Sequence, residues 1–189
     1  RLGKLPESHE FFNRVLYTGR EEFSPQLKAD AIAGLGSVFD DSGDLAAAEF
    51  MYQESLRIKN ASWIHHNLAR TYRRDRKLEE SIKAATTALD MEPSNYTYML
   101  ALAEVFYDAE LLTKAFDVYK QAAELAPQEY YPRYMMAYTA SRQRLWTTAL
   151  AEYNRLLTGD IQLEVRGAVY KGIGNVYHEQ EKYDEALSA

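Results

Sequence analysis

The sequence predicts an all-α protein that is assembled from repeated pairs of helices. Segments of roughly 12 to 16 residues place apolar side chains three and four residues apart, which is the period of an amphipathic helix. No segment alternates apolar and polar residues as a half-buried strand would, and the 189 residues include only 9 glycines and 5 prolines. A pattern of small and aromatic residues also recurs about every 34 residues, as in a helical-repeat protein.

The recurring pattern contains two small residues that lie twelve residues apart. The first one follows a large apolar residue and, in four of five copies, precedes an aromatic ring by three residues. The first small residues are Gly36, Ala69, Ala103, Ala137 and Gly174. The second small residues are Ala48, Ser81, Ala115, Ala149 and Ala186. Small side chains at a fixed period let neighbouring helices approach closely, so the sequence predicts stacked helix pairs that share one core.

This pattern resembles the tetratricopeptide repeat, whose unit of about 34 residues is a pair of antiparallel helices. The resemblance implies a right-handed superhelical solenoid, with the first helix of each pair on a concave groove. It also implies a single array over residues 1–189, in which residues 7–22 are the second helix of a preceding repeat. The repeats that follow are 29–61 (repeat 1), 62–95 (repeat 2), 96–129 (repeat 3), 130–163 (repeat 4, looser) and 167–189 (repeat 5, truncated).

Capping residues and prolines mark the limits of several helices. Ser24 and Pro25 predict the start of the first helix of repeat 1, because serine caps a helix and proline suits its first turn. Asp160 is expected to cap the first helix of repeat 5 in the same way. Pro93 and Pro127 lie where the second helices of repeats 2 and 3 must already have ended. Repeats 1 and 5 start late, so their first helices are expected to be longer than the others.

The candidate binding residues lie on or beside one stripe of the first helices, next to the stripe that the repeat uses for packing. Spacings of three and four residues keep such positions on one helix face. The resemblance implies that this stripe faces the groove. The candidates are Trp63, His66, Asn67, Arg70, Arg73, Tyr107, Tyr131, Tyr134, Tyr138, Lys171 and Asn175.

Repeat 4 provides the strongest binding signal. Tyr131, Tyr134 and Tyr138 fall at i, i+3 and i+7, while other residues occupy the packing stripe of the same helix. The three rings therefore exceed what the repeat needs for its core, and tyrosine is a residue that dominates binding interfaces. The alternative interpretation is that these rings pack against the neighbouring first helix.

Repeat 2 adds a basic surface. Arg70 and Arg73 point toward the groove by their phase and could hold a carboxylate of a partner, although the acidic Asp40 could neutralise them. Lys171 and Asn175 match the first helix of the clamp with which some tetratricopeptide repeats bind the carboxylates of heat-shock chaperones. The next two helices of that clamp are missing from the sequence, so a chaperone clamp is not expected.

Composition argues against several classes of function. The formal net charge of −6 disfavours nucleic acid, and single-stranded RNA on the arginine and tyrosine surface is a minor alternative. There is no cysteine and no pair of histidines at i and i+4, so neither a metal nor a cofactor is expected. No apolar stretch reaches about 18 residues, so no membrane span is expected. Nothing fixes the compartment, although a soluble cytoplasmic protein fits this composition.

These observations predict a protein–protein interaction scaffold that binds a peptide or a helix of a partner in its groove. No constellation of catalytic residues is present, so the chain is not expected to be an enzyme. The alternative is a structural or assembly module that self-associates through its repeat ends or spaces the domains of a larger protein. This alternative is motivated by the final repeat, which stops soon after its second helix begins.

Overall fold

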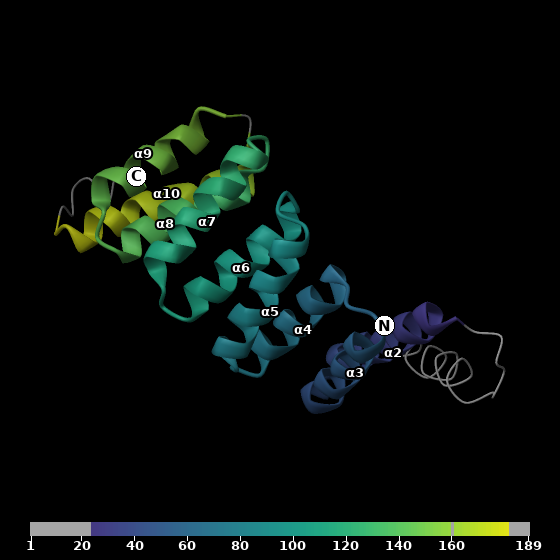
Figure 1. Cartoon of the computed structure of the whole chain (residues 1–189). Coiled ribbons are helices and arrows are strands. Elements are labelled where there is room, and N and C mark those ends of the chain that lie inside the picture. The colour runs from purple at the N-terminus through teal and green to yellow at the C-terminus, as the bar shows by residue number, and fades with distance from the viewer. Residues whose placement is uncertain (1–23, 160, 182–189) are drawn as a thin grey trace. The chain divides into compact units, whose positions relative to one another are not determined.

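The computed structural model describes residues 24–159 and 161–181, and within these ranges it is entirely helical (Figure 1). Nine helices and no strand occur there, which confirms the predicted all-α helical-repeat class. The helices are α2 (Pro25–Ser42), α3 (Leu45–Ile58), α4 (Ser62–Arg74), α5 (Leu78–Met91), α6 (Tyr96–Asp108), α7 (Leu112–Leu125), α8 (Tyr130–Arg142), α9 (Trp146–Leu157) and α10 (Leu163–Glu179). The predicted helix within 7–22 and the end of repeat 5 lie outside the described residues. In the part that is described, no helix is both long and apolar enough to cross a membrane.

The chain divides into two compact units, Arg1–Ala101 and Leu102–Ala189. In the N-terminal unit, α2 packs against α3, α3 against α4, and α4 against α5. In the C-terminal unit, α7 packs against α8, α8 against α9, and α9 against α10. Within each unit these helices contact their neighbours in the sequence, so local helix pairs are the building blocks of both units.

The turns between paired helices share one backbone feature. Gly43 ends α2 in the left-handed region with a φ of 88°, and its N–H donates to the carbonyl oxygen of Asp40. The equivalent turns also contain a left-handed residue, but it is not glycine. These residues are Arg76 (φ 61°), Glu110 (φ 57°), Arg144 (φ 59°) and Glu181 (φ 61°). Left-handed backbone closes the helix end and reverses the chain, and it does so four times at the steric cost that a Cβ imposes.

The core is built from small residues and buried tyrosine rings. Tyr52, Tyr119 and Tyr153 are each 0% exposed. In the N-terminal unit the Tyr52 ring covers Gly36, where an added Cβ would lie 3.0 Å from ring carbons. In the C-terminal unit a Cβ added at Gly172 would lie 2.5 Å from Cζ of Tyr153. These close approaches explain why glycine stands inside two helices, since any larger residue would push the ring out of its place.

Helix lengths follow the late starts of repeats 1 and 5. The first helices of these repeats, α2 and α10, have 18 and 17 residues, whereas α4, α6 and α8 have 13 each. Ser24 caps α2 as predicted, because its Oγ accepts a hydrogen bond of 3.2 Å from the N–H of Leu27. The expectation that Asp160 caps α10 is wrong, since the cap residue is Gln162. Ile161 packs against the core between the two positions, so the helix begins only after it.

Candidate protein-binding surface

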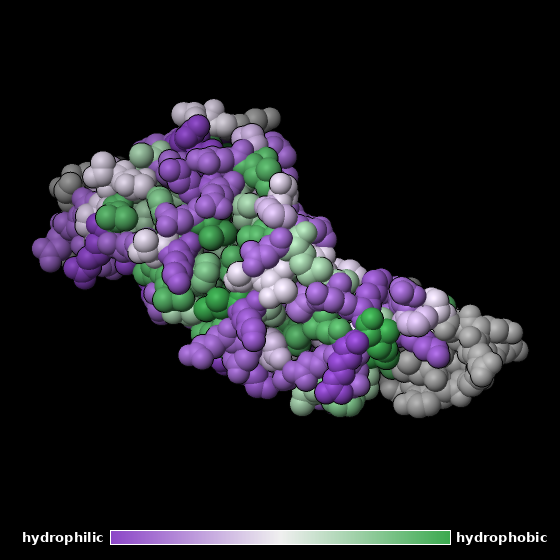
Figure 2. Space-filling view, in the orientation of Figure 1, coloured by the Kyte–Doolittle hydropathy of each residue, from purple (hydrophilic) through white to green (hydrophobic). Residues whose placement is uncertain are grey.

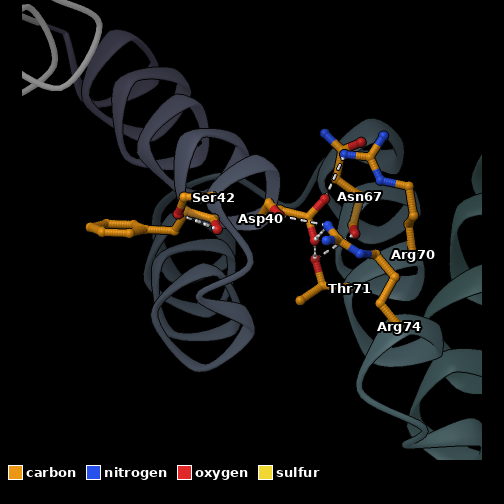
Figure 3. Close-up of polar contacts among 7 residues, drawn as sticks. Asp40, Ser42, Asn67, Arg70, Thr71 and Arg74 are labelled. Carbon is orange, nitrogen blue, oxygen red and sulfur yellow. Dashed lines mark hydrogen bonds and ion pairs between the residues drawn. The ribbon is translucent and has the colours of Figure 1, made fainter. Parts of the chain in front are cut away.

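A buried carboxylate organises the predicted basic surface of the N-terminal unit (Figure 3). Asp40, at the end of α2, is 1% exposed and faces three side chains of α4. Its Oδ2 accepts a hydrogen bond of 3.0 Å from Nη2 of Arg70, and its Oδ1 accepts one of 3.2 Å from Oγ1 of Thr71. Nη1 of Arg74 lies 2.8 Å from Oδ1 and also donates to the backbone oxygen of Asp40. Asp40 therefore neutralises Arg70, one of the two arginines predicted to form the basic surface, and also pairs with Arg74.

The other candidates of the N-terminal unit are half-buried on α4. The ring of His66 stacks on that of Tyr98, with 5.0 Å between the ring centroids. The backbone oxygen of Asn67 accepts a hydrogen bond from Thr71, and the side chains of Trp63 and Arg73 are partly exposed. His66 and Asn67 thus contact their own unit, and all four residues keep part of their surface exposed.

Three tyrosines of the C-terminal unit form a continuous cluster, which we call the tyrosine cluster (Tyr107, Tyr134 and Tyr138). Tyr138 lies between the other two, at 5.8 Å from Tyr107 and 6.5 Å from Tyr134 between ring centroids. Tyr134 also meets the buried ring of Tyr153 edge to face at 5.8 Å, so it is partly a core residue. Tyr131 donates a hydrogen bond of 3.1 Å to Glu104. The three tyrosines of α8 that the sequence predicts as candidates are therefore not equivalent, and Tyr138 is the central one.

Arg142 fixes one end of the tyrosine cluster. Its guanidinium lies 5.7 Å from the centre of the Tyr107 ring, and its Nη1 donates a hydrogen bond of 2.8 Å to the Tyr107 hydroxyl. Its Nη2 is 3.1 Å from both carboxylate oxygens of Glu110. Burial, followed by the contact with the Tyr138 hydroxyl, raises the pKa of Tyr107 to about 12. The phenol of Tyr107 is thus a neutral group held in place at neutral pH.

A cavity of about 510 Å³ opens beside Tyr138. It is bounded by the ends of α8 and α10 and by the turn that leads into α9. Its lining residues are Tyr138, Ser141, Arg142, Arg144, Trp146, Asn175, Val176, His178 and Glu179. The cavity brings together two predicted residues, Tyr138 and Asn175, whereas Lys171 is exposed on α10 and does not line it. The cavity combines two aromatic rings, Tyr138 and Trp146, with a lining that is otherwise mostly polar or charged.

Sequence reasoning missed Arg142, Arg144, Trp146 and Glu179 as lining residues, whereas helical phase places Ser141 and His178 on the same stripe as the candidates. Arg142 follows Tyr138 by four residues, so its place on the same helix face could have been found. Arg144 lies in a turn and Trp146 begins a second helix, and helical phase does not define the direction of either side chain.

A further cavity of about 450 Å³ in the C-terminal unit contains none of the predicted residues. Arg133 and Glu152 line it and form an ion pair of 2.8 Å in which both side chains are mostly buried. Among the described residues, no group of three or more His, Cys, Asp or Glu side chains could hold a metal ion.

The geometry matches known repeat proteins in fold. YrrB, whose crystal structure is that of a TPR protein with an unusual peptide-binding site, aligns with a TM-score of 0.72 at 16% identity, over 94% of this chain and 87% of its own. BtubC from P. vanneervenii gives a TM-score of 0.75 at 17% identity, over 98% of this chain and 85% of its own. PilF of Pseudomonas aeruginosa gives 0.73 at 17% identity, over 98% and 81%. No curated protein matches the sequence.

Family models match the sequence over most of repeats 1 to 3. One model, described as tetratricopeptide repeat, covers residues 29–62, and a second with the same description covers residues 66–130. The two matches follow each other almost without a gap, in phase with the small residues that first revealed the repeats. The chain therefore belongs to the tetratricopeptide repeat family.

Proposed function

We propose that the chain binds an extended peptide or a helix of a partner protein on its first helices, with Tyr138 and the cavity beside it as the main contact. The family itself is a scaffold for protein–protein interaction and is generally non-enzymatic. The finer proposal is carried by one observation, which is that a half-buried ring at the centre of the tyrosine cluster borders a cavity of about 510 Å³.

The chemistry of this surface supports peptide binding. Aromatic side chains provide a large contact area with few rotatable bonds, and arginine and asparagine supply hydrogen bonds to a peptide. Tyr107 and Tyr134 hold Tyr138 from both sides, so a ligand would meet a ring that is already ordered. On the first helices of the N-terminal unit, Trp63, Asn67 and Arg73 offer a smaller accessory surface, together with the exposed parts of His66 and Arg70. Tyr131, Lys171 and Asn175 complete the proposed contacts of the C-terminal unit.

The test is a selection of random peptides on the full chain, followed by binding measurements with the enriched peptides. Tyr138→Ala should weaken binding about tenfold or more, the effect of losing an interface anchor. Tyr170→Ala is the matched control, because Tyr170 is 42% exposed on α10 and does not line the cavity. Thermal unfolding of both variants separates lost binding from lost structure. Peptides that bind Tyr138→Ala as tightly as the unsubstituted chain would contradict the proposal.

Self-association is a second candidate, and one observation favours it. Leu163, the first residue of α10, is 80% exposed, and apolar side chains are interspersed among hydrophilic ones on the face shown in Figure 2. Light scattering over a concentration series measures it directly. A mass that rises with concentration, and falls back in Leu163→Glu, would favour an assembly module. A constant monomer mass together with peptide binding favours the scaffold.

A further inference from the structure

One position of the repeat connects a first helix to the first helix of the following repeat. At two such junctions inside the units, a side chain at this position reaches across and makes the contact. Counting from the first residue of each repeat, this is position 12, and it meets positions 9 and 13 of the following repeat. In the N-terminal unit the residue is Asp40, which pairs with Arg70 at position 9 and Arg74 at position 13. In the C-terminal unit it is Tyr107, which meets Tyr138 at position 9 and Arg142 at position 13.

At the next junction of the C-terminal unit, the side chain at this position is too small to reach the following repeat. The residue at position 12 of repeat 4 is Ser141, whose hydroxyl turns back and donates to the carbonyl oxygen of Tyr138 on its own helix at 2.7 Å. Positions 9 and 13 of repeat 5 are Asn175 and Glu179, and both line the cavity of about 510 Å³ together with Ser141. The cavity therefore lies where Asp40 or Tyr107 stands at the other two junctions.

The lining of the cavity selects the kind of side chain that could fill it. Tyr138 and Trp146 provide ring surfaces, as Tyr138 does for Tyr107 one junction earlier. Arg144 donates only and Glu179 accepts only at neutral pH, and neither has an ion pair with another described residue. A carboxylate would face the like charge of Glu179, and an ammonium group would face Arg144; Arg142 also lines the cavity, but its guanidinium is already paired with Glu110. A phenol suits both, because its hydroxyl can donate and accept.

We propose that this cavity receives a tyrosine side chain of the bound partner, in the place that Tyr107 takes at the preceding junction. This inference rests on the proposed peptide-binding function and names the residue that the peptide must contain. The ring would lie against Tyr138 and Trp146, and the hydroxyl would be recognised by Arg144 and Glu179. The volume is large enough for an aromatic ring together with the adjoining main chain, which is the size range of ligand pockets.

The first test uses the peptides from the selection described above. The enriched peptides should contain tyrosine, and its replacement by phenylalanine should weaken binding about fivefold, the effect of one hydrogen bond. Replacement by alanine should weaken binding about thirtyfold or more. Enriched peptides without tyrosine, or with a tyrosine that alanine replaces at no loss, would overturn the inference while peptide binding itself still stood.

Variants of the cavity make the test independent of the peptide sequence. Ser141→Tyr places a phenol at position 12, as Tyr107 does, and should reduce binding at least tenfold while the helix content is retained. Asn154→Tyr is the matched control on the exposed side of α9 and should bind normally. Arg144→Gly relieves the left-handed strain of the turn, so it should fold at least as stably, yet it should lessen the preference for tyrosine over phenylalanine. Unchanged binding by Ser141→Tyr would overturn the inference.

A small probe separates failure of the cavity from failure of peptide binding. In Trp63→Phe, the only tryptophan left is Trp146, which lines the cavity. N-acetyltyrosinamide should then change the tryptophan emission in a saturable way, N-acetylphenylalaninamide should do so more weakly, and Ser141→Tyr should abolish the response. This result would support the tyrosine site even if no peptide were enriched, in which case only the proposed function fails. An equal response before and after Ser141→Tyr would overturn the site.

Discussion

Asp40 shows how one buried charge joins two helix pairs of the N-terminal unit. Its carboxylate is 1% exposed, whereas the side chains of Arg70 and Arg74 are 45% and 43% exposed. Burial of a polar group is unfavourable unless it is hydrogen-bonded, and here two arginines and Thr71 provide partners for the carboxylate. The two arginines, in contrast, can replace these hydrogen bonds with bonds to water. Loss of the ion pairs is therefore more unfavourable for Asp40 than for either arginine.

We expect Asp40→Ala to lower the free energy of unfolding by about 2 kcal/mol, because it removes every interaction of the carboxylate and leaves a small cavity. Arg70→Ala should cost less, about 1 kcal/mol, because Arg74 still pairs with Asp40. Urea unfolding followed by the emission of Trp63, in a Trp146→Phe background, measures both. Arg57→Ala is the control, since Arg57 is 74% exposed in a surface pair with Glu54. Equal costs for Asp40→Ala and Arg57→Ala would contradict the argument.

The hydroxyl of Tyr153 is buried and has no hydrogen-bond partner among the described residues, which is unfavourable for a polar group. Tyr153→Phe should therefore raise the free energy of unfolding, by up to about 1 kcal/mol. Tyr72→Phe is the opposite case, because the Tyr72 hydroxyl bonds both Gln53 and Glu49, and it should lower stability by about 1 kcal/mol. Thermal or urea unfolding compares the pair, and the same sign for both substitutions would contradict the prediction.

At the scale of elements, the turns between paired helices share a left-handed backbone but differ in the residue that adopts it. Gly43 suits the left-handed backbone, whereas Arg76 adopts it with a side chain that clashes with the main chain. Arg144 and Glu110 have the same steric cost at their turns. Arg144 also lines the cavity, and Glu110 also pairs with Arg142. In those two turns, strain and a polar contact occur at the same residue.

Two reciprocal substitutions test the strain in these turns. Gly43→Ala should lower the free energy of unfolding by about 1 kcal/mol, and Arg76→Gly should raise it by a similar or smaller amount. Both changes are expected to leave helix content, measured by circular dichroism, unchanged at low temperature. A lower melting temperature for Arg76→Gly would contradict this prediction. It would mean that contacts of the Arg76 side chain stabilise the turn by more than its backbone strain destabilises it.

Over the whole molecule, burial shifts the ionisation of several tyrosines. It raises the pKa of Tyr52 to about 12, that of Tyr107 to about 12, and those of Tyr72, Tyr134 and Tyr153 in the same direction. In the unfolded chain these phenols lose their protons near pH 10, about the ordinary value for tyrosine. Between about pH 10 and 12 the unfolded state therefore binds fewer protons than the folded state, and stability falls as pH rises.

Alkaline titration should show two classes of tyrosine. Phenolate absorbance should rise first for the exposed rings, and the buried rings should ionise later, together with loss of the helical circular dichroism signal. Tyr52→Phe removes one of the shifted groups and should make the late step smaller. If all 15 tyrosines ionised together near pH 10 with the helices intact, the buried positions of these rings would be contradicted.

The sequence was sufficient for the fold class because packing of small residues leaves a signal at a fixed spacing. Gly36 and Tyr52 belong to that signal, and the structure places them in contact. The sequence indicated that Asp40 could neutralise the basic surface, but it did not identify Arg74 as a partner, because helical phase gives the direction of a side chain but not which residue about 30 positions away will meet it. Tyr138 was predicted as a binding candidate, but the cavity beside it depends on the small size of Ser141 and on a turn whose direction the sequence does not reveal.

The proposed binding site arises because position 12 of repeat 4 carries a small side chain, so its place in the array depends on which repeat carries the small residue. Tyr107 and Ser141 occupy the same position in consecutive repeats, so exchanging them, as Tyr107→Ser with Ser141→Tyr, should close the present cavity and open another one repeat earlier. The new opening would have Tyr138 and Arg142 among its walls, and it would no longer be bounded by Glu179. In such an array, one residue at position 12 would thus determine which repeat carries the proposed recognition site.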